Sequence, residues 1–275
     1  MGRGTSAPTF TIPGLTPGVK RLIIINVAIY VVFVLLMRTP LAPWLLALML
    51  SPADTFSGQL WQPLTYMFLH EPASPGHLLM NVLMLFFFGR NVEQLAGTKK
   101  LYQIYVLSGL GGAALTLLLG LVSLGMPLGW LGTFWTSVHL GASGAVFGLI
   151  LYWGAVQWND TANFFLLGSM QVKTFIYIII GIEVLGVIAL SHDTSYTSHF
   201  GGMIAGFLLG RYGVPKLAVP NLKKMRANAK HRQTAQRLSR FKVIDGGGEN
   251  PGSSDDTVGR PIWRQPDDDD DPTVH

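Results

Sequence analysis

The sequence predicts an all-α fold, a polytopic membrane bundle of six transmembrane helices with an interfacial first loop. Three observations predict it: a shortage of charge, a series of apolar segments, and basic residues in alternate connections. Charged residues make up only 13% of the 275-residue chain, against about 25% in soluble globular proteins. Because the shortage is concentrated in residues 22–210, this part of the chain is expected to lie in a membrane.

Six apolar segments are candidate spans, at 22–37, 78–89, 101–124, 143–158, 174–191 and 200–210. A membrane span needs about 20 residues, and several segments reach that length only with flanking polar residues. The polar residues inside them are therefore candidates for function. The connection 38–76 is expected to lie in the membrane interface, anchored by Trp44 and Trp61.

Basic residues mark the connections that should face the cytoplasm, namely Lys20 and Arg21, Lys99 and Lys100, Lys173, and Arg211 with Lys216. The other connections contain only Arg38. The pattern predicts that both termini are cytoplasmic, in a plasma membrane such as a bacterial inner membrane. Spans two, four and six then begin at the outer face, so His77, Ser143 and His199 share one membrane depth.

The composition divides the chain into four parts: a flexible cytoplasmic N-terminus (1–19), the six-span domain (20–212), a basic cytoplasmic segment (213–244) and a disordered acidic tail (245–275). Nine of the 20 Lys and Arg lie between residues 216 and 242. Beside a membrane domain, such a stretch favours contact with anionic lipid over nucleic acid. The lipid bilayer is therefore an expected partner, and nucleic acid is not. The absence of cysteine excludes disulfides and thiol nucleophiles.

Ser143 lies in the motif Gly141-Ala-Ser-Gly144. At a helix start this motif exposes a hydroxyl and leaves backbone N–H groups for an oxyanion, although alone it favours helix packing. His199 is followed by glycines three, seven and eleven residues later, which let a neighbouring helix approach closely. Packing this stripe on the small residues after Ser143 would bring the serine to His199. His139 is the alternative base.

Three further features carry chemistry. His77 and Asn81 are spaced i, i+4 on one helix face, which suits either an oxyanion site or hydrogen bonds between helices. His70-Glu71 precedes His77 at a spacing that does not fit a zinc protease motif, and the prolines between deny it a helix. No metal and no cofactor are therefore predicted. Glu183, within span five, is a candidate proton-relay residue.

At this point the sequence resembles the rhomboid intramembrane serine proteases. The resemblance covers about residues 20–212 and is carried by five ordered motifs: Trp61-Gln-Pro-Leu-Thr-Tyr-Met-Phe-Leu-His70, His77-Leu-Leu-Met-Asn81, Gly89 to Glu93, Gly141-Ala-Ser-Gly144 and His199-Phe-Gly-Gly-Met-Ile-Ala-Gly206. It implies a six-span core, a Ser–His dyad without an essential third acid, and single-span membrane proteins as substrates. It also implies that the loop 38–76 is embedded in the membrane.

The resemblance assigns Ser143 as nucleophile and His199 as general base, with His77, Asn81 and the Ser143 backbone N–H as the oxyanion site. Phe147 replaces a tyrosine that often stacks on the histidine in the family, and stacking is expected to survive. Gln62 follows Trp61 where many members carry arginine. Asp193 is the acid nearest to His199 in sequence and is expected in a solvated loop.

The predicted function is thus an intramembrane serine endopeptidase that cleaves transmembrane segments with a Ser–His dyad. Two alternatives come from other classes. A non-catalytic rhomboid-like protein would hold client helices without cutting them. A proton-coupled transporter would require Glu183 and not Ser143.

Overall fold

The computed structural model describes residues 14–124, 133–164, 168–189 and 195–215. Its helices, in chain order, are α1 (Pro17–Leu36), α2 (Ala42–Leu46), α3 (Pro52–Phe56), α4 (Gln62–Thr65), the 3₁₀ turn η1 (Tyr66–Phe68), α5 (Pro75–Met84), the π-helical turn η2 (Leu85–Gly89), α6 (Arg90–Ala96), α7 (Thr98–Leu124), α8 (Ser143–Val156), α9 (Val172–Ala189) and α10 (Tyr196–Tyr212). Most of the predicted N-terminal segment, the basic segment and the acidic tail lie outside the described residues.

A helix occupies each of the six segments that the sequence predicts as spans. Helix α1 begins at Pro17, inside the predicted flexible segment 1–19, because proline at the first helical position needs no hydrogen bond. The second segment is longer than predicted, since α5, η2 and α6 follow one another without a break. Among the described residues, α1, α7 and α9 are long and apolar enough to cross a membrane.

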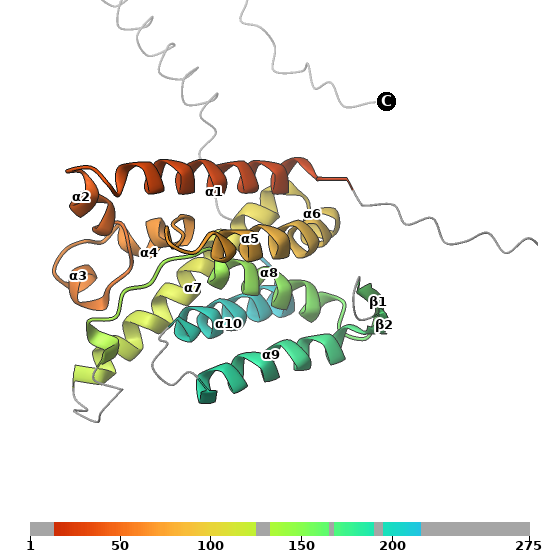
Figure 1. The fold of residues 1–275 in the computed structure, drawn as a ribbon. Helices are drawn as coiled ribbons and strands as arrows, with labels where there is room; N and C mark the ends of the chain where they lie inside the picture. The colour runs from red at the N-terminus through yellow and green to blue at the C-terminus, as the bar shows by residue number, and fades with distance from the viewer. Residues whose placement is uncertain (1–13, 125–132, 165–167, 190–194, 216–275) are drawn as a thin grey trace, which may run out of the picture. The chain divides into compact units, whose positions relative to one another are not determined.

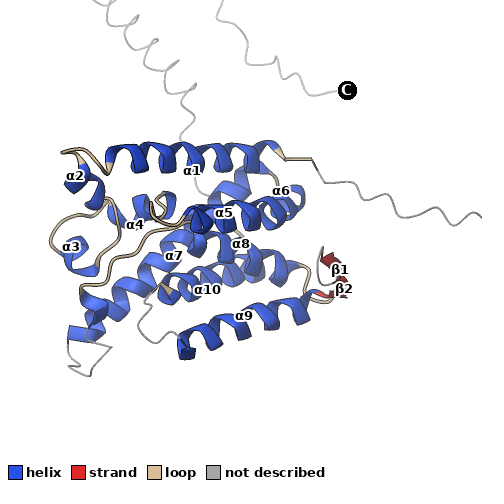
Figure 2. Ribbon diagram, in the orientation of Figure 1, coloured by secondary structure: helices blue, strands red, loops and turns tan. Residues whose placement is uncertain are grey.

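In the described part of the chain, the predicted all-α fold is interrupted by a two-stranded hairpin between α8 and α9 (Figure 2). Strands β1 (Thr161–Phe164) and β2 (Gly168–Gln171) pair antiparallel. Phe164 stacks on Phe175 of α9 with ring centroids 4.2 Å apart, which fixes the hairpin against that helix. Each strand has only four residues, the lower limit at which an alternation of polar and apolar residues indicates a strand, and the hairpin was not predicted from the sequence.

The centre of the bundle is built from α7, α8 and α10, which make the closest packing in the molecule. Glycines allow it. Gly202 and Gly206 of α10 lie directly against the backbone carbonyls of Gly144 and Gly148 in α8. Small residues let helix backbones approach until they touch. The predicted stripe after His199 therefore packs on the predicted face after Ser143.

Helices α1 and α9 form opposite edges of the bundle (Figure 1). Both expose large apolar side chains, including Leu35 of α1 and Leu185 and Ile188 of α9. Soluble monomers rarely leave a continuous apolar surface of this kind. These edges suit the hydrocarbon of a bilayer.

The long connection 38–76 folds into the short helices α2, α3 and α4 and is held by Gln62, which is fully buried. The Gln62 Oε1 accepts hydrogen bonds from the Ser51 amide (3.0 Å) and the Thr55 hydroxyl (2.8 Å). Its Nε2 donates to the Gln59 side chain (2.9 Å) and to the Ala47 carbonyl (3.3 Å). A neutral amide thus anchors the loop through four hydrogen bonds.

Candidate active site

Ser143 is the first residue of α8, and the loop before it is fixed on both sides. The Gly141 amide donates to the Tyr66 carbonyl (3.0 Å), and Leu50 forms a β-bridge with His139. Gly141 has φ of +131°, a conformation that favours glycine. The chain therefore turns sharply into α8, and the first backbone N–H groups of the helix have no partners within it.

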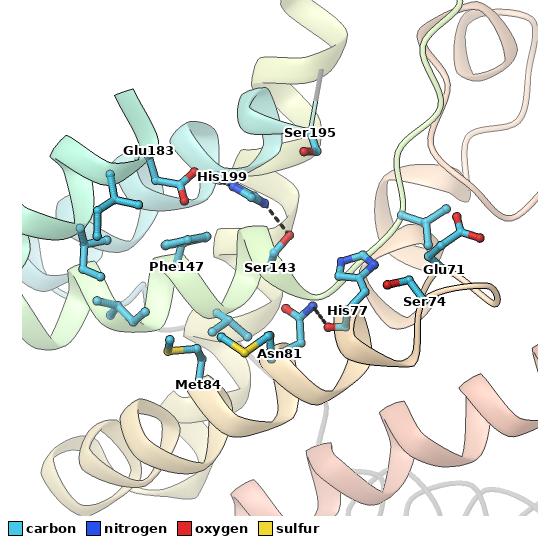
Figure 3. Close-up of a pocket in the computed structure, with 16 residues that line it drawn as sticks. Glu71, Ser74, His77, Asn81, Met84, Ser143, Phe147, Glu183, Ser195 and His199 are labelled. Carbon is cyan, nitrogen blue, oxygen red and sulfur yellow. Dashed lines mark hydrogen bonds and ion pairs between the residues drawn. The ribbon is translucent and has the colours of Figure 1, made fainter. Parts of the chain in front are cut away.

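His199 lies in the first turn of α10, beside Ser143. Its Nε2 is 2.8 Å from the Ser143 Oγ (Figure 3). The Phe147 ring packs on the imidazole with centroids 4.7 Å apart, and Tyr196 meets it edge-on at 5.8 Å. The imidazole thus contacts two aromatic rings, and one of its nitrogens is directed at the serine hydroxyl.

Glu183 of α9 occupies the other side of the imidazole. Its Oε2 is 2.7 Å from the His199 Nδ1, and its side chain is only 10% exposed. Figure 3 shows the carboxylate, the imidazole and the serine hydroxyl in line. The structure therefore differs from the expected two-residue arrangement, because an acid also contacts the histidine. Asp193, the acid considered from sequence, lies outside the described residues.

His77 and Asn81 of α5 line the same cavity from the opposite wall. The His77 ring lies against Gly141, where an added Cβ would come within 2.8 Å of its Nε2. The Asn81 Nδ2 donates to the His77 carbonyl (2.9 Å). Because an amide NH₂ has two hydrogens, one remains after this bond.

A cavity of about 610 Å³ joins these groups. Its polar end holds Ser143, His199, His77 and Asn81, and its apolar wall is formed by residues of α5, α8 and α9, including Met80, Met84, Val146, Ile150, Ile179 and Ile182. A large apolar cavity with a few converging polar groups is the usual form of a binding site.

The other histidines of the described region point elsewhere. His139, the alternative base, is buried, and its Nε2 lies 2.8 Å from the Ser137 hydroxyl. His70 is fully buried with its ring 5.3 Å from that of His77. Burial, together with the nearby His77, lowers the pKa of His70 to about 4, so this ring is neutral at pH 7.

The sequence pattern does not predict that Glu183 lies beside His199. A carboxylate within an apolar segment indicates only a candidate proton relay. A signal was present, since Glu183 lies near the end of α9 and His199 near the start of α10. In adjacent antiparallel helices, two residues close to one connection lie at a similar depth.

The fold and the site define a class of protein: a helical membrane protein with a serine–histidine pair inside its bundle. A family model described as Rhomboid domain matches residues 57–216. This chain belongs to the Rhomboid domain family, and it is an integral multi-pass membrane protein.

Three relatives show the range of similarity. RHOMBOID-like protein 1 of Arabidopsis thaliana is 32% identical over 158 residues, covering 55% of this chain and 34% of that protein. RHOMBOID-like protein 5 of the same plant is 30% identical over 193 residues, covering 67% and 56%. Rhomboid protease AarA of Providencia stuartii is 28% identical over 198 residues, covering 68% and 69%. The chain thus spans about a third of the first relative and just over half of the second.

Proposed function

We propose that this chain is a serine endopeptidase that cleaves transmembrane segments of single-span membrane proteins inside the bilayer. The observation that carries the proposal is the 2.8 Å contact between the His199 Nε2 and the Ser143 Oγ at the start of α8. A serine hydroxyl in contact with an imidazole is the usual arrangement of an activated nucleophile. Here it opens on a cavity with an apolar wall.

In the proposed reaction, His199 takes the Ser143 proton while the Ser143 Oγ attacks a peptide carbonyl of the substrate. The C–N bond then breaks, the leaving amine takes the proton from His199, and an acyl-enzyme remains on Ser143. A water molecule, deprotonated by His199, attacks the acyl carbonyl. The bond between that carbon and the Ser143 Oγ breaks, and His199 returns the proton to the Oγ. The cavity supplies that water.

The tetrahedral intermediate carries a negative charge that needs hydrogen-bond donors. The proposed donors are the Ser143 backbone N–H, the His77 ring and the free hydrogen of the Asn81 amide. Support comes from their position: His77 and Asn81 line the cavity that contains Ser143, and His77 packs on Gly141. The helix dipole of α8 adds positive potential at the same end.

The membrane setting is part of the proposal. Helix α8 has 14 residues, which gives a length of about 21 Å, shorter than the roughly 30 Å of a bilayer core. Ser143 at its outer end would therefore lie below the membrane surface. We propose a six-span domain over residues 20–212, with both termini in the cytoplasm and the protein in a plasma or bacterial inner membrane.

The test uses the purified full chain in detergent, a fluorophosphonate probe and a reporter protein with one transmembrane segment. Wild type should label and cleave, and Ser143→Ala should do neither. Ser108→Ala is the matched control, because Ser108 is a fully buried serine of α7 that lies outside the cavity. Labelling that persists in Ser143→Ala would refute the assigned nucleophile.

The reporter assay and a proton-transport assay together separate the two alternative functions. A client-binding protein would capture the reporter without cutting it, in wild type and in Ser143→Ala alike. A proton-coupled transporter would move protons in reconstituted vesicles in a Glu183-dependent manner and would not need Ser143. The contact of Glu183 with His199 favours the protease, since it gives the carboxylate a partner in the same site.

A further inference from the structure

We propose that Glu183 is a positioning residue for the reaction: it holds His199 in the tautomer that accepts the Ser143 proton and stabilises the imidazolium that forms. This inference rests on the proposed protease function and extends it from two residues to three. It is carried by the 2.7 Å contact between the Glu183 Oε2 and the His199 Nδ1.

The hydrogen-bond pattern fixes which nitrogen carries the proton. A neutral imidazole has one N–H donor and one acceptor nitrogen. The Ser143 hydroxyl can donate its proton only if the Nε2 is the acceptor, so the hydrogen must be on the Nδ1. A carboxylate is an acceptor only, and at the Nδ1 it selects this tautomer and disfavours the other.

The buried carboxylate of Glu183 also needs a partner. An ionised carboxylate within an apolar helix is costly unless it is paired, and the side chain of Glu183 is 10% exposed. Its neighbours along α9 are mostly large aliphatic residues. The contact with His199 supplies the pairing in the ground state. When the imidazole gains the Ser143 proton, the same contact becomes an ion pair.

A second contact sets the register of α9 against α10 at this point. Gly186 follows Glu183 by three residues, so both lie on one face of α9. The Tyr196 ring packs beside Gly186, where an added Cβ would collide with the Tyr196 hydroxyl. Tyr196 also packs edge-on against His199. The fit of Tyr196 beside Gly186 therefore brings Glu183 level with the imidazole.

The experiment compares Glu183→Gln with Glu183→Asp in the full chain, measuring kcat and KM for the reporter. Glutamine keeps the shape and removes the charge. We expect kcat to fall on the order of 100-fold with KM within about twofold, because the loss falls on the transition state. Glu183→Asp restores the charge, and its kcat should be on the order of tenfold higher than that of Glu183→Gln.

Gly181→Ala is the control on the same helix, because no atom lies within 4 Å of a Cβ at that position, and it should keep the wild-type kcat. Wild-type kcat in Glu183→Gln would overturn the inference. So would an equal loss in the Gln and Asp variants that follows their unfolding temperatures, since that assigns Glu183 a structural role. Failure of the protease function itself is recognised separately, by a wild type that neither labels nor cleaves.

Discussion

Gly206 of α10 lies against the backbone of Gly148 in α8, so closely that a Cβ at position 206 would fall 2.6 Å from the Gly148 Cα. Each helix carries one half of the site near its N-terminal end, Ser143 on α8 and His199 on α10. Close packing two turns away from the chemistry thus sets the distance between the two reacting groups.

Gly206→Ala should therefore reduce both stability and activity. The added methyl group meets backbone atoms that cannot rotate away, and overpacking of this kind costs about 1–3 kcal/mol. The measurements are the unfolding temperature in detergent and the rate of reporter cleavage. Gly181→Ala is the matched control: its methyl group has free space, and alanine is the better helix former by about 1 kcal/mol. An unchanged Gly206→Ala protein would contradict the packing.

Phe147 should matter through the orientation of the imidazole. Its ring packs on His199 at 4.7 Å, and its loss leaves space in which the imidazole can turn away from Ser143. We expect Phe147→Ala to lower the cleavage rate about 10- to 100-fold, the scale of a small misplacement of a reacting group. Phe147→Tyr keeps the ring, and its hydroxyl can reach the cavity, so its rate should stay near wild type. Equal rates for alanine and phenylalanine would disprove this role.

Much of the fold follows from the sequence because membrane helices need long apolar segments, and the six predicted segments all contain helices. The contact between Ser143 and His199 could be predicted from the spacing of Gly202 and Gly206, because glycines on one helix face allow close packing against another helix. The sequence did not reveal that α7 also joins this contact, where an added Cβ on Gly112 would lie 2.6 Å from the Ser198 carbonyl.

The partner of Glu183 was harder to predict for a physical reason. A buried acid in an apolar helix needs a partner, but periodicity gives only its own helix face. The nearness of Glu183 and His199 to one connection indicates a similar depth, but it does not show that their two side chains face each other. The anchoring of the first loop by Gln62 could not be predicted for a similar reason. Its four hydrogen-bond partners are spread over Ala47, Ser51, Thr55 and Gln59, in a loop without repeating pattern.

Gln62→Leu should loosen the first loop. Leucine fills the space but leaves the Ser51 amide and the Thr55 hydroxyl without their acceptor, and unsatisfied buried groups cost about 1–3 kcal/mol each. We expect a lower unfolding temperature and faster proteolytic cleavage within residues 47–62. Leu60→Ala is the control in the same loop, because Leu60 is largely exposed. A Gln62→Leu protein as protease-resistant as wild type would show that the loop is held by other contacts.

Glu93 provides a pH-dependent clamp at the start of α1. Its carboxylate accepts hydrogen bonds from the Gly18 amide (2.8 Å), the Val19 amide (3.0 Å) and the Thr98 hydroxyl (2.6 Å). Burial alone would raise the pKa of Glu93, but these hydrogen bonds outweigh it and hold the pKa below its usual value. The charged form also suits the positive end of the α1 dipole.

Because the pKa of Glu93 is lower in the folded protein than in the unfolded chain, its contribution to stability is complete above the unfolded value, about 4.3. That contribution is lost as the pH falls through the folded pKa. At pH 7, Glu93→Gln should therefore unfold at a lower temperature than wild type, and the gap should narrow between about pH 5 and pH 3. Asp54→Asn removes an exposed carboxylate and serves as the control. Its unfolding temperature should change with pH as that of wild type does. A gap for Glu93→Gln that stays constant across this range would mean that the carboxylate holds α1 by shape and not by charge.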